Sequence, residues 1–273
     1  MVRRVSGRRR GAGCSSRLII AAIIAIASLV MYFSSQQENP VTGETQYIDL
    51  TVDQEIAIGL QAAPEMAAQF GGLDPDQNAQ ALVDQIGFHI VQSSPAGQSP
   101  YEFDFHLLDD EETINAFALP GGQIFITRAL YDRLSTEAEL AGVLGHEIGH
   151  VVARHSAEHI AKAKLTEGLT GAAVIATYDP ENPSSAQAAQ IAAVIGQLIN
   201  MKFGREDELE SDFLGVCFID DAGYDPQALV AVMQVLAQSR QGEGPPEFFS
   251  THPNPERRVQ RIQEAIANLD QCP

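Results

Sequence analysis

Apolar positions at helical spacing dominate the chain from about residue 51 onward. They recur every three or four residues over 51–70 and again over 75–93, and this period predicts two helices. Thr136 followed by Glu139 forms a capping-box pattern, which predicts that another helix begins there. Further helices are expected over residues 165–177, 186–201, 206–222, 226–239 and 255–269.

Between the helix expected at 75–93 and the one that begins at Thr136, the spacing of apolar residues shortens to every second residue. Residues 101–108 alternate between apolar and polar side chains, which is the pattern of a half-buried strand. Two shorter strands are expected at 115–119 and 124–127, joined by a turn that contains Gly121 and Gly122. The sequence therefore predicts an α+β domain that is mainly helical, with a small three-stranded sheet next to the capped helix.

The N-terminal segment follows a different pattern. Residues 18–33 are sixteen uncharged and strongly apolar residues, close to the roughly 20 that a membrane-spanning helix needs. Six arginines precede this stretch and no acidic residue occurs before Glu38, so the positive-inside rule predicts a cytoplasmic N-terminus. We therefore expect a transmembrane anchor at 18–33, with the bulk of the chain periplasmic or extracytoplasmic.

The same segment can also be interpreted as a cleaved signal. Cleavage after Ala27 would fit the Ala-x-Ala pattern of residues 25–27, but it would leave the apolar residues 29–33 near the new N-terminus, so a retained anchor is favoured. The chain then divides into a basic cytoplasmic N-terminus at 1–17, the anchor at 18–33, a linker at 34–50 and one domain at 51–273.

Composition narrows the classes of function. The 273 residues are 45% hydrophobic and 19% charged, which excludes a disordered chain. With 17 basic and 36 acidic residues the net charge is −19, so no nucleic-acid partner is expected, because phosphate contacts need clustered Lys and Arg. Cys217 and Cys272 lie in the part expected to be exported, where they could form a disulfide or remain free.

One motif in the capped helix carries chemistry. His146, Glu147 and His150 form the pattern HExxH. Residues four apart lie on the same side of a helix, so both imidazoles can bind one zinc ion. Glu147 can then reach a water molecule on that metal and act as its general base. The alternative is a pair of surface histidines, but a capped helix directly after a small sheet is the setting that a zinc peptidase needs.

Catalytic zinc sites usually have three protein ligands, so the motif needs another one. His155 and His159 lie farther along the same helix, and we expect them to be solvated or capping residues. The better source is the acidic run at 205–212. There, Glu208 and Asp212 are four residues apart, so one could bind metal while the other supports a ligand histidine. A solvated acidic face is the alternative, and spacing does not choose among Glu206, Asp207, Glu208 and Glu210.

Five motifs in order resemble those of one enzyme family. They are residues 115–122, residues 139–150 continuing to His155, residues 205–212 with Gly215, residues 222–226, and residues 251–253 with Arg258. Over roughly 51–269 the chain resembles the membrane-associated zinc metallopeptidases that include HtpX, CAAX prenyl protease 1 and the periplasmic protease of outer-membrane barrel assembly. The resemblance implies a zincin-type metallopeptidase fold.

The resemblance also implies a role for each site residue. His146, His150 and Glu208 would bind one Zn²⁺ per chain. Glu147 would be the catalytic base, and Asp212 would be the carboxylate that orients a ligand histidine. Ser211 stands where the family usually has alanine, which is not a ligand position. The expected function is therefore that of a zinc-dependent metalloendopeptidase, and the predicted topology suggests that it acts on unfolded or misassembled envelope proteins.

Substrate binding and gating are expected at the sheet and at one further histidine. An extended substrate would add as a strand to an edge of the sheet, either at Asn115, Ala116 and Phe117 or at 124–127. His252 would gate the zinc from a loop, or would be an ordinary turn histidine before proline. The alternative function is a gated, chaperone-like zinc module with little proteolytic activity. A prenyl-peptide processor is disfavoured, because that branch has several membrane spans around its site.

Overall fold

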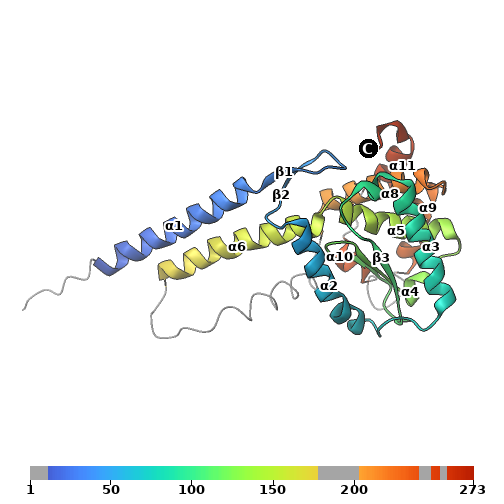
Figure 1. The fold of residues 1–273 in the computed structure, drawn as a ribbon, viewed down its shortest axis with the longest axis horizontal. Coiled ribbons are helices and arrows are strands. Elements are labelled where there is room, and N and C mark those ends of the chain that lie inside the picture. The colour runs from blue at the N-terminus through green and yellow to red at the C-terminus, as the bar shows by residue number, and fades with distance from the viewer. Residues whose placement is uncertain (1–11, 178–202, 240–246, 253–256) are drawn as a thin grey trace, which may run out of the picture.

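Three of the helices that surround or contain the HExxH motif begin at a polar capping side chain. The computed structural model describes residues 12–177, 203–239, 247–252 and 257–273 (Figure 1). Thr51, Asp76 and Thr136 each accept a hydrogen bond from a backbone N–H of the helix that follows, which satisfies donors that are free at a helix start. The helix expected at 186–201 lies outside the described residues.

The described elements include those expected outside 186–201. The helices are α1 (Ala12–Ser34), α2 (Val52–Gln69), α3 (Gln77–Ser93), α4 (Arg128–Tyr131), α5 (Glu137–Val152), α6 (His155–Thr177), α8 (Arg205–Asp221), α9 (Gln227–Gln238), α10 (Phe248–Thr251) and α11 (Arg258–Ile266), with 3-10 turns η1 (Pro95–Gln98) and η2 (Leu269–Gln271). The strands are β1 (Gln36–Glu38), β2 (Thr45–Tyr47), β3 (Asp104–Leu108), β4 (Ala116–Ala118) and β5 (Gln123–Thr127). However, α6 begins ten residues before the helix expected at 165–177, and β1, β2, α4, α10 and the two 3-10 turns were not predicted.

The middle of the chain forms the expected three-stranded sheet. Its order is β3–β5–β4, with β5 parallel to β3 and antiparallel to β4. Gly121 and Gly122, in the turn between β4 and β5, have φ angles of 81° and 106°, which glycine adopts without a steric penalty. Because β5 has a partner on each side, it cannot accept an added strand, whereas β4 lies at an edge.

The HExxH helix α5 is the centre of the fold. Its residues from Leu140 to Val152 are all buried, so it is covered on every side rather than on one face only. The sheet, α3, α8 and α9 pack around it. The predicted class, a mainly helical α+β fold with a small sheet beside the HExxH helix, is confirmed.

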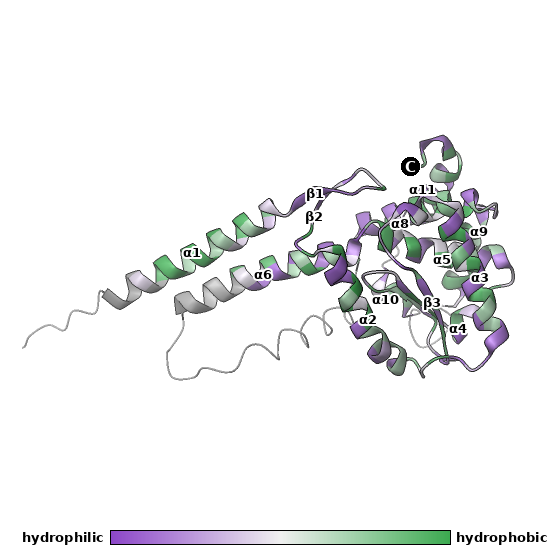
Figure 2. Ribbon diagram, viewed as in Figure 1, coloured by the Kyte–Doolittle hydropathy of each residue, from purple (hydrophilic) through white to green (hydrophobic). Residues whose placement is uncertain are grey.

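The N-terminal helix corrects one expectation. α1 carries the apolar residues 18–33 (Figure 2) and runs alongside α6 (Figure 1). Among the described residues, no helix combines the length and the apolar character needed to cross a membrane. The sixteen apolar residues rise about 24 Å, which is less than the roughly 30 Å of a bilayer core. The expected transmembrane anchor, and with it the single-pass localisation with a periplasmic or extracytoplasmic domain, is therefore wrong.

Residues 34–50, the stretch expected to be a linker, contain the antiparallel hairpin of β1 and β2. The side chain of Asn39 donates to the carbonyl oxygen of Val152 at 2.8 Å. Gln46 donates in the same way to the carbonyl of Ala153. Carbonyl groups in the last turn of a helix have no partner within the helix, so the hairpin satisfies the C-terminal end of α5.

Arg154 turns the chain at the end of α5. Its φ angle is 57°, a left-handed conformation that is uncommon for residues other than glycine. The guanidinium forms a buried ion pair with Glu55 of α2 and donates to the carbonyl of Leu50, and the hydroxyl of Tyr101 donates to Glu55 at 2.8 Å. The turn ends the helix, so a separate helix, α6, begins at His155.

Candidate metal centre

Small residues allow α5 and α8 to approach closely. A Cβ atom at Gly149 would lie 2.8 Å from Ser211 Oγ, and one at Gly215 would lie 3.1 Å from the backbone nitrogen of His146. The hydroxyl of Ser211 donates to the carbonyl of His146 at 2.6 Å. This contact places the acidic beginning of α8 beside the histidines of α5.

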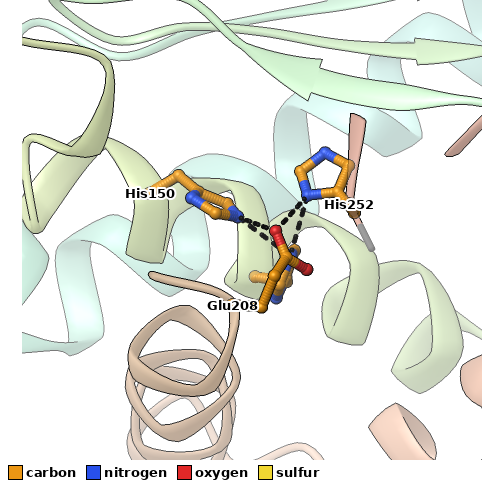
Figure 3. Close-up of side chains that lie close together, drawn as sticks. His150, Glu208 and His252 are labelled. Atoms are coloured by element: carbon orange, nitrogen blue, oxygen red, sulfur yellow. Dashed lines mark hydrogen bonds and ion pairs between the residues drawn. The ribbon is translucent and has the colours of Figure 1, made fainter. Parts of the chain in front are cut away.

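Four side chains converge at this contact. They are His146 and His150 from α5, Glu208 from α8 and His252 from the end of α10 (Figure 3). The Nε2 atoms of His146 and His150 are 3.1 Å apart. His252 Nδ1 lies 3.4 Å from His146 Nε2 and 2.9 Å from Glu208 Oε1, and His150 Nε2 lies 3.4 Å from Glu208 Oε1. None of the four residues is more than 1% exposed.

The donor atoms fit one zinc ion. Ligand atoms bound at about 2.0–2.2 Å in a tetrahedron are about 3.3–3.6 Å from one another. The distances that Glu208 and His146 make within the cluster run from 2.9 to 3.7 Å, and the four donor atoms all lie within 4.8 Å of one another. Three imidazoles and one carboxylate are ligand types that zinc takes in proteins. The expected cofactor, zinc, therefore fits the residues that are present.

Asp212 and Arg258 contact the cluster residues His146 and Glu208, and Arg258 compensates the charge of both carboxylates. Asp212 Oδ1 lies 2.9 Å from Nδ1 of His146. Arg258 donates to Asp212 at 2.6 and 2.8 Å and pairs with Glu208 at 2.8 Å. Burial alone would raise the pKa of Asp212, but the charge of Arg258 lowers it. The pKa of Glu208 is also lowered, because the charges of His252 and Arg258 outweigh the effect of burial, so both carboxylates are ionised.

Glu147 adds a further carboxylate beside the cluster. It is fully buried, and neither of its carboxylate oxygens has a hydrogen-bond partner among the described residues. The closest ionisable nitrogen is His252 Nε2, 3.7 Å from Glu147 Oε1. Burial raises the pKa of Glu147, with His252 and His146 partly opposing it. A buried carboxylate with a raised pKa beside a candidate metal centre is a candidate general base.

His252 completes the cluster from a distant part of the chain. Its ring stacks on Phe248 with centroids 4.5 Å apart. Burial by itself would lower the pKa of His252, but the carboxylates of Glu208 and Glu147 raise it. Three ligands would leave one tetrahedral position to water, and His252 Nδ1 occupies the place of that fourth ligand.

His155, which was not expected to take part in the site, lies directly beside the cluster. His155, expected to be solvated or capping, is 1% exposed, and its Nδ1 lies 2.8 Å from Nδ1 of His150. The expectation failed because α5 ends at Val152 and the turn at Arg154 directs His155 back toward it. His159 lies one turn farther along α6 and pairs with Asp207 at 2.7 Å.

The carboxylates of the acidic run at 205–212 have different partners. Among its carboxylates, Glu208 enters the cluster, Asp212 faces His146, Glu210 pairs with His155, Asp207 pairs with His159 and Glu206 is exposed. Two contacting residues were given no role beforehand. Arg258 could have been suspected, because buried carboxylates need a positive partner. No sequence pattern marks Phe203, whose ring stacks on His150 with centroids 4.0 Å apart.

The expected substrate edge lies next to the cluster. A pocket is lined by Asn115 and Phe117 at the edge strand β4, by Phe70 and Phe203, and by His252. The side-chain oxygen of Asn115 is buried and has no hydrogen-bond partner among the described residues. The pocket thus joins the free edge of the sheet to the candidate metal centre.

Comparison with known proteins gives one consistent result. Residues 77–266 match the model of peptidase family M48. The chain is 32% identical over 251 residues to the beta-barrel assembly-enhancing protease of Yersinia pestis, covering 90% of this chain and 50% of that protein. It is 30% identical over 250 residues to the mitochondrial metalloendopeptidase OMA1 of Schizosaccharomyces pombe, covering 90% of this chain and 71% of that protein.

The Escherichia coli (strain K12) beta-barrel assembly-enhancing protease is 29% identical over 254 residues, covering 88% of this chain and 50% of that protein. The chain thus spans about half the length of these bacterial relatives. The family match covers the HExxH helix, the acidic helix α8 and the α11 arginine, and the motif-based resemblance is confirmed. The chain belongs to peptidase family M48, a family of zinc metallopeptidases.

Proposed function

We propose that the protein is a zinc-dependent metalloendopeptidase in which Glu147 is the catalytic base. The observation that carries the proposal is the carboxylate of Glu147, which is fully buried beside the metal cluster and has no hydrogen-bond partner among the described residues. A purely structural zinc site has no use for such a group, whereas peptide hydrolysis requires a base next to the attacking water.

Each neighbouring residue then has a defined task. His146, His150 and Glu208 hold the zinc ion, which when bound polarises the peptide carbonyl and acidifies water. Glu147 accepts a proton from the attacking water and returns it to the leaving amine. Asp212 accepts a hydrogen bond from Nδ1 of His146 and so keeps Nε2 of that ring directed at the metal.

His252 acts as a gate in this proposal. Its Nδ1 occupies the fourth ligand position, which a catalytic site leaves to water, so His252 must withdraw before a substrate is cleaved. The same contact supports the alternative function of a gated, chaperone-like zinc module. The experiment below separates the two functions.

The substrate binds as an added strand. The free edge of β4, with Asn115, Ala116 and Phe117, borders the pocket beside the cluster, and the unpartnered oxygen of Asn115 is placed to accept a backbone N–H of the peptide. Strand addition requires an extended peptide, so unfolded polypeptides are the substrate class. The names of the bacterial relatives refer to β-barrel assembly, which supports misassembled envelope proteins as substrates by analogy.

Zinc content and casein hydrolysis, both measured on the full chain, test this proposal. The parent should hold about one zinc ion. Glu147→Gln should keep the zinc but lose at least about 100-fold of the hydrolysis rate, and Glu208→Ala should lose both. Glu206→Ala is the matched control, because Glu206 is exposed on the same helix and its loss should change neither.

Each other outcome has a defined meaning. A parent that holds zinc but cleaves nothing supports the gated binding module, and His252→Ala should then release activity if the gate is the reason. A parent without zinc after purification in its presence contradicts the proposal. So does a Glu147→Gln chain that cleaves casein as fast as the parent.

A further inference from the structure

In the two histidines of α5 that face the metal position, the Nδ1 atoms have different hydrogen-bond partners. Nδ1 of His146 faces the carboxylate of Asp212 at 2.9 Å, which is the common arrangement for a zinc-binding histidine. Nδ1 of His150 faces another imidazole, with His155 Nδ1 at 2.8 Å, and His155 Nε2 lies 3.2 Å from Glu210 Oε2. A chain of three groups therefore leads from the metal cluster to Glu210, whose side chain is 29% exposed.

The positions of the protons in this chain follow from the geometry. Nε2 of His150 lies 3.1 Å from His146 Nε2 and 3.4 Å from Glu208 Oε1, so it points into the cluster and offers its lone pair to the metal. Nδ1 of His150 must then carry the hydrogen. Because His155 Nδ1 is only 2.8 Å away, it has to be the acceptor. The remaining hydrogen of His155 is on Nε2, which donates to Glu210.

The fold holds His155 firmly in this place. His155 is the first residue of α6, directly after the left-handed Arg154, and it is 1% exposed. Its ring lies 4.9 Å from that of His150 and 6.1 Å from that of Phe203, measured between centroids. Glu210 comes from α8, the helix that also supplies Glu208. Helix α8 therefore carries both the cluster residue Glu208 and the carboxylate that pairs with His155.

We propose that His155 is a positioning residue for zinc binding. It accepts the hydrogen bond from Nδ1 of His150 and, with Glu210 as its own acceptor, fixes the ring orientation and the tautomer of that ligand. This inference rests on the zinc site of the proposed function, but it does not depend on proteolysis.

Zinc affinity of the full chain tests the inference, measured by competition with a chelator of known affinity. His155→Leu removes the acceptor and should raise the zinc Kd by about 10- to 100-fold. In His155→Asn the amide oxygen can take the place of Nδ1 and accept the same hydrogen bond, so its Kd should stay within about threefold of the parent value. Thermal unfolding of each zinc-free variant shows whether a change in Kd merely reflects a change in folding.

His159→Leu is the matched control. His159 lies four residues after His155 on the same helix and forms a similar pair with a carboxylate of α8, Asp207 Oδ2 at 2.7 Å. It has no hydrogen bond to a member of the metal cluster among the described residues. Its replacement should leave the zinc Kd within about threefold of the parent value.

Either of two results would overturn the inference. In the first, His155→Leu binds zinc as tightly as the parent. In the second, His155→Asn folds but binds zinc as weakly as His155→Leu. If His155→Leu does not fold, the tautomer of His155 decides, measured by nitrogen-15 NMR on the zinc-loaded parent. A hydrogen on Nδ1 of His155 refutes the inference. A parent that binds zinc but cleaves nothing contradicts only the proteolytic function, whereas a parent that binds no zinc overturns both proposals.

Discussion

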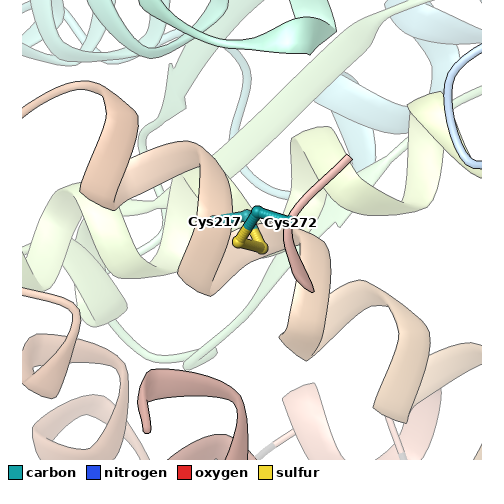
Figure 4. The surroundings of a disulfide bond; sticks show 2 residues. All are labelled: Cys217 and Cys272. Carbon is teal, nitrogen blue, oxygen red and sulfur yellow. A yellow bond between two sulfur atoms is a disulfide. The ribbon is translucent and has the colours of Figure 1, made fainter. Parts of the chain in front are cut away.

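Breaking the disulfide between Cys217 and Cys272 should weaken the fold by a predictable amount. The bond joins α8 to the C-terminal segment (Figure 4), and the two cysteines are 55 residues apart in the sequence. The loop that it closes contains α9, α10 and α11, and with them His252 and Arg258. The cross-link therefore restrains the part of the chain that reaches the metal cluster from the C-terminal side.

The expected magnitude comes from loop closure. In the chain-entropy model a cross-link over 55 residues removes about 14 cal/mol/K from the unfolded state, which is about 4 kcal/mol at 25 °C. Cys272→Ala leaves Cys217 as a buried thiol, 1% exposed, and such a thiol behaves as a small apolar side chain. The loss of the cross-link is then the main effect, and the free energy of unfolding should fall by about 3–4 kcal/mol.

Urea unfolding of the zinc-free chain measures this difference, because bound metal would add its own stabilisation. Reduction of the parent should lower the urea midpoint about as much as Cys272→Ala does, and reductant should not change the variant further. Thiol titration confirms that reduction is complete. If the fully reduced parent unfolds at the same urea concentration and with the same slope as the oxidised parent, the loop-closure reasoning is refuted.

Two further predictions concern parts away from the metal. Hydrogen bonds from Arg128 at 2.7 and 2.8 Å lower the pKa of Asp74 below its ordinary 3.8, so this pairing stabilises the fold above that pH and is lost as the pH falls through the folded value. Asp74→Asn should therefore lower the free energy of unfolding by about 1–3 kcal/mol at pH 7, and the difference should shrink below about pH 4 in urea titrations. A difference independent of pH would contradict this assignment. A Cβ at Gly59 would lie 1.9 Å from the carbonyl oxygen of Pro120, so Gly59→Ala should cost about 1–3 kcal/mol. Gln61→Ala, exposed on the same helix, should change stability by less than about 0.5 kcal/mol in the same urea assay, and equal values for the two variants would contradict the predicted clash.

The features that could be predicted from the sequence are those that involve residues close together in the chain. Thr136 caps α5 because its hydroxyl accepts from the backbone N–H of Glu139, a contact between residues three apart. His146 and His150 converge for an equally local reason, since four residues are about one helical turn. Strand β3 also follows from alternation within a few residues, and Gly121 and Gly122 mark the turn between β4 and β5. For these features, which depend on neighbours in sequence, the pattern was sufficient, whereas the short hairpin of β1 and β2 was not predicted.

The remaining site features depend on contacts between distant segments. The choice of Glu208 as the metal-facing carboxylate depends on the close packing of α8 on α5 at Gly149 and Gly215. The role of His155 depends on a single left-handed residue, Arg154, which no helical period reveals. The pairing of the two cysteines, left open by the sequence, depends on the tertiary fold as well.

The metal centre therefore forms only when several distant parts of the fold are assembled. Two of its donors are fixed by one turn of α5, but Glu208 depends on the packing of α8, and His252 comes from the segment enclosed by the disulfide. The end of α5 is in turn held by the N-terminal hairpin and by the pairing of Arg154 with Glu55. An unfolded chain brings at most the two α5 histidines together, so strong zinc binding belongs to the folded state. The zinc-dependent activity proposed for this chain therefore requires that its distant segments have packed together.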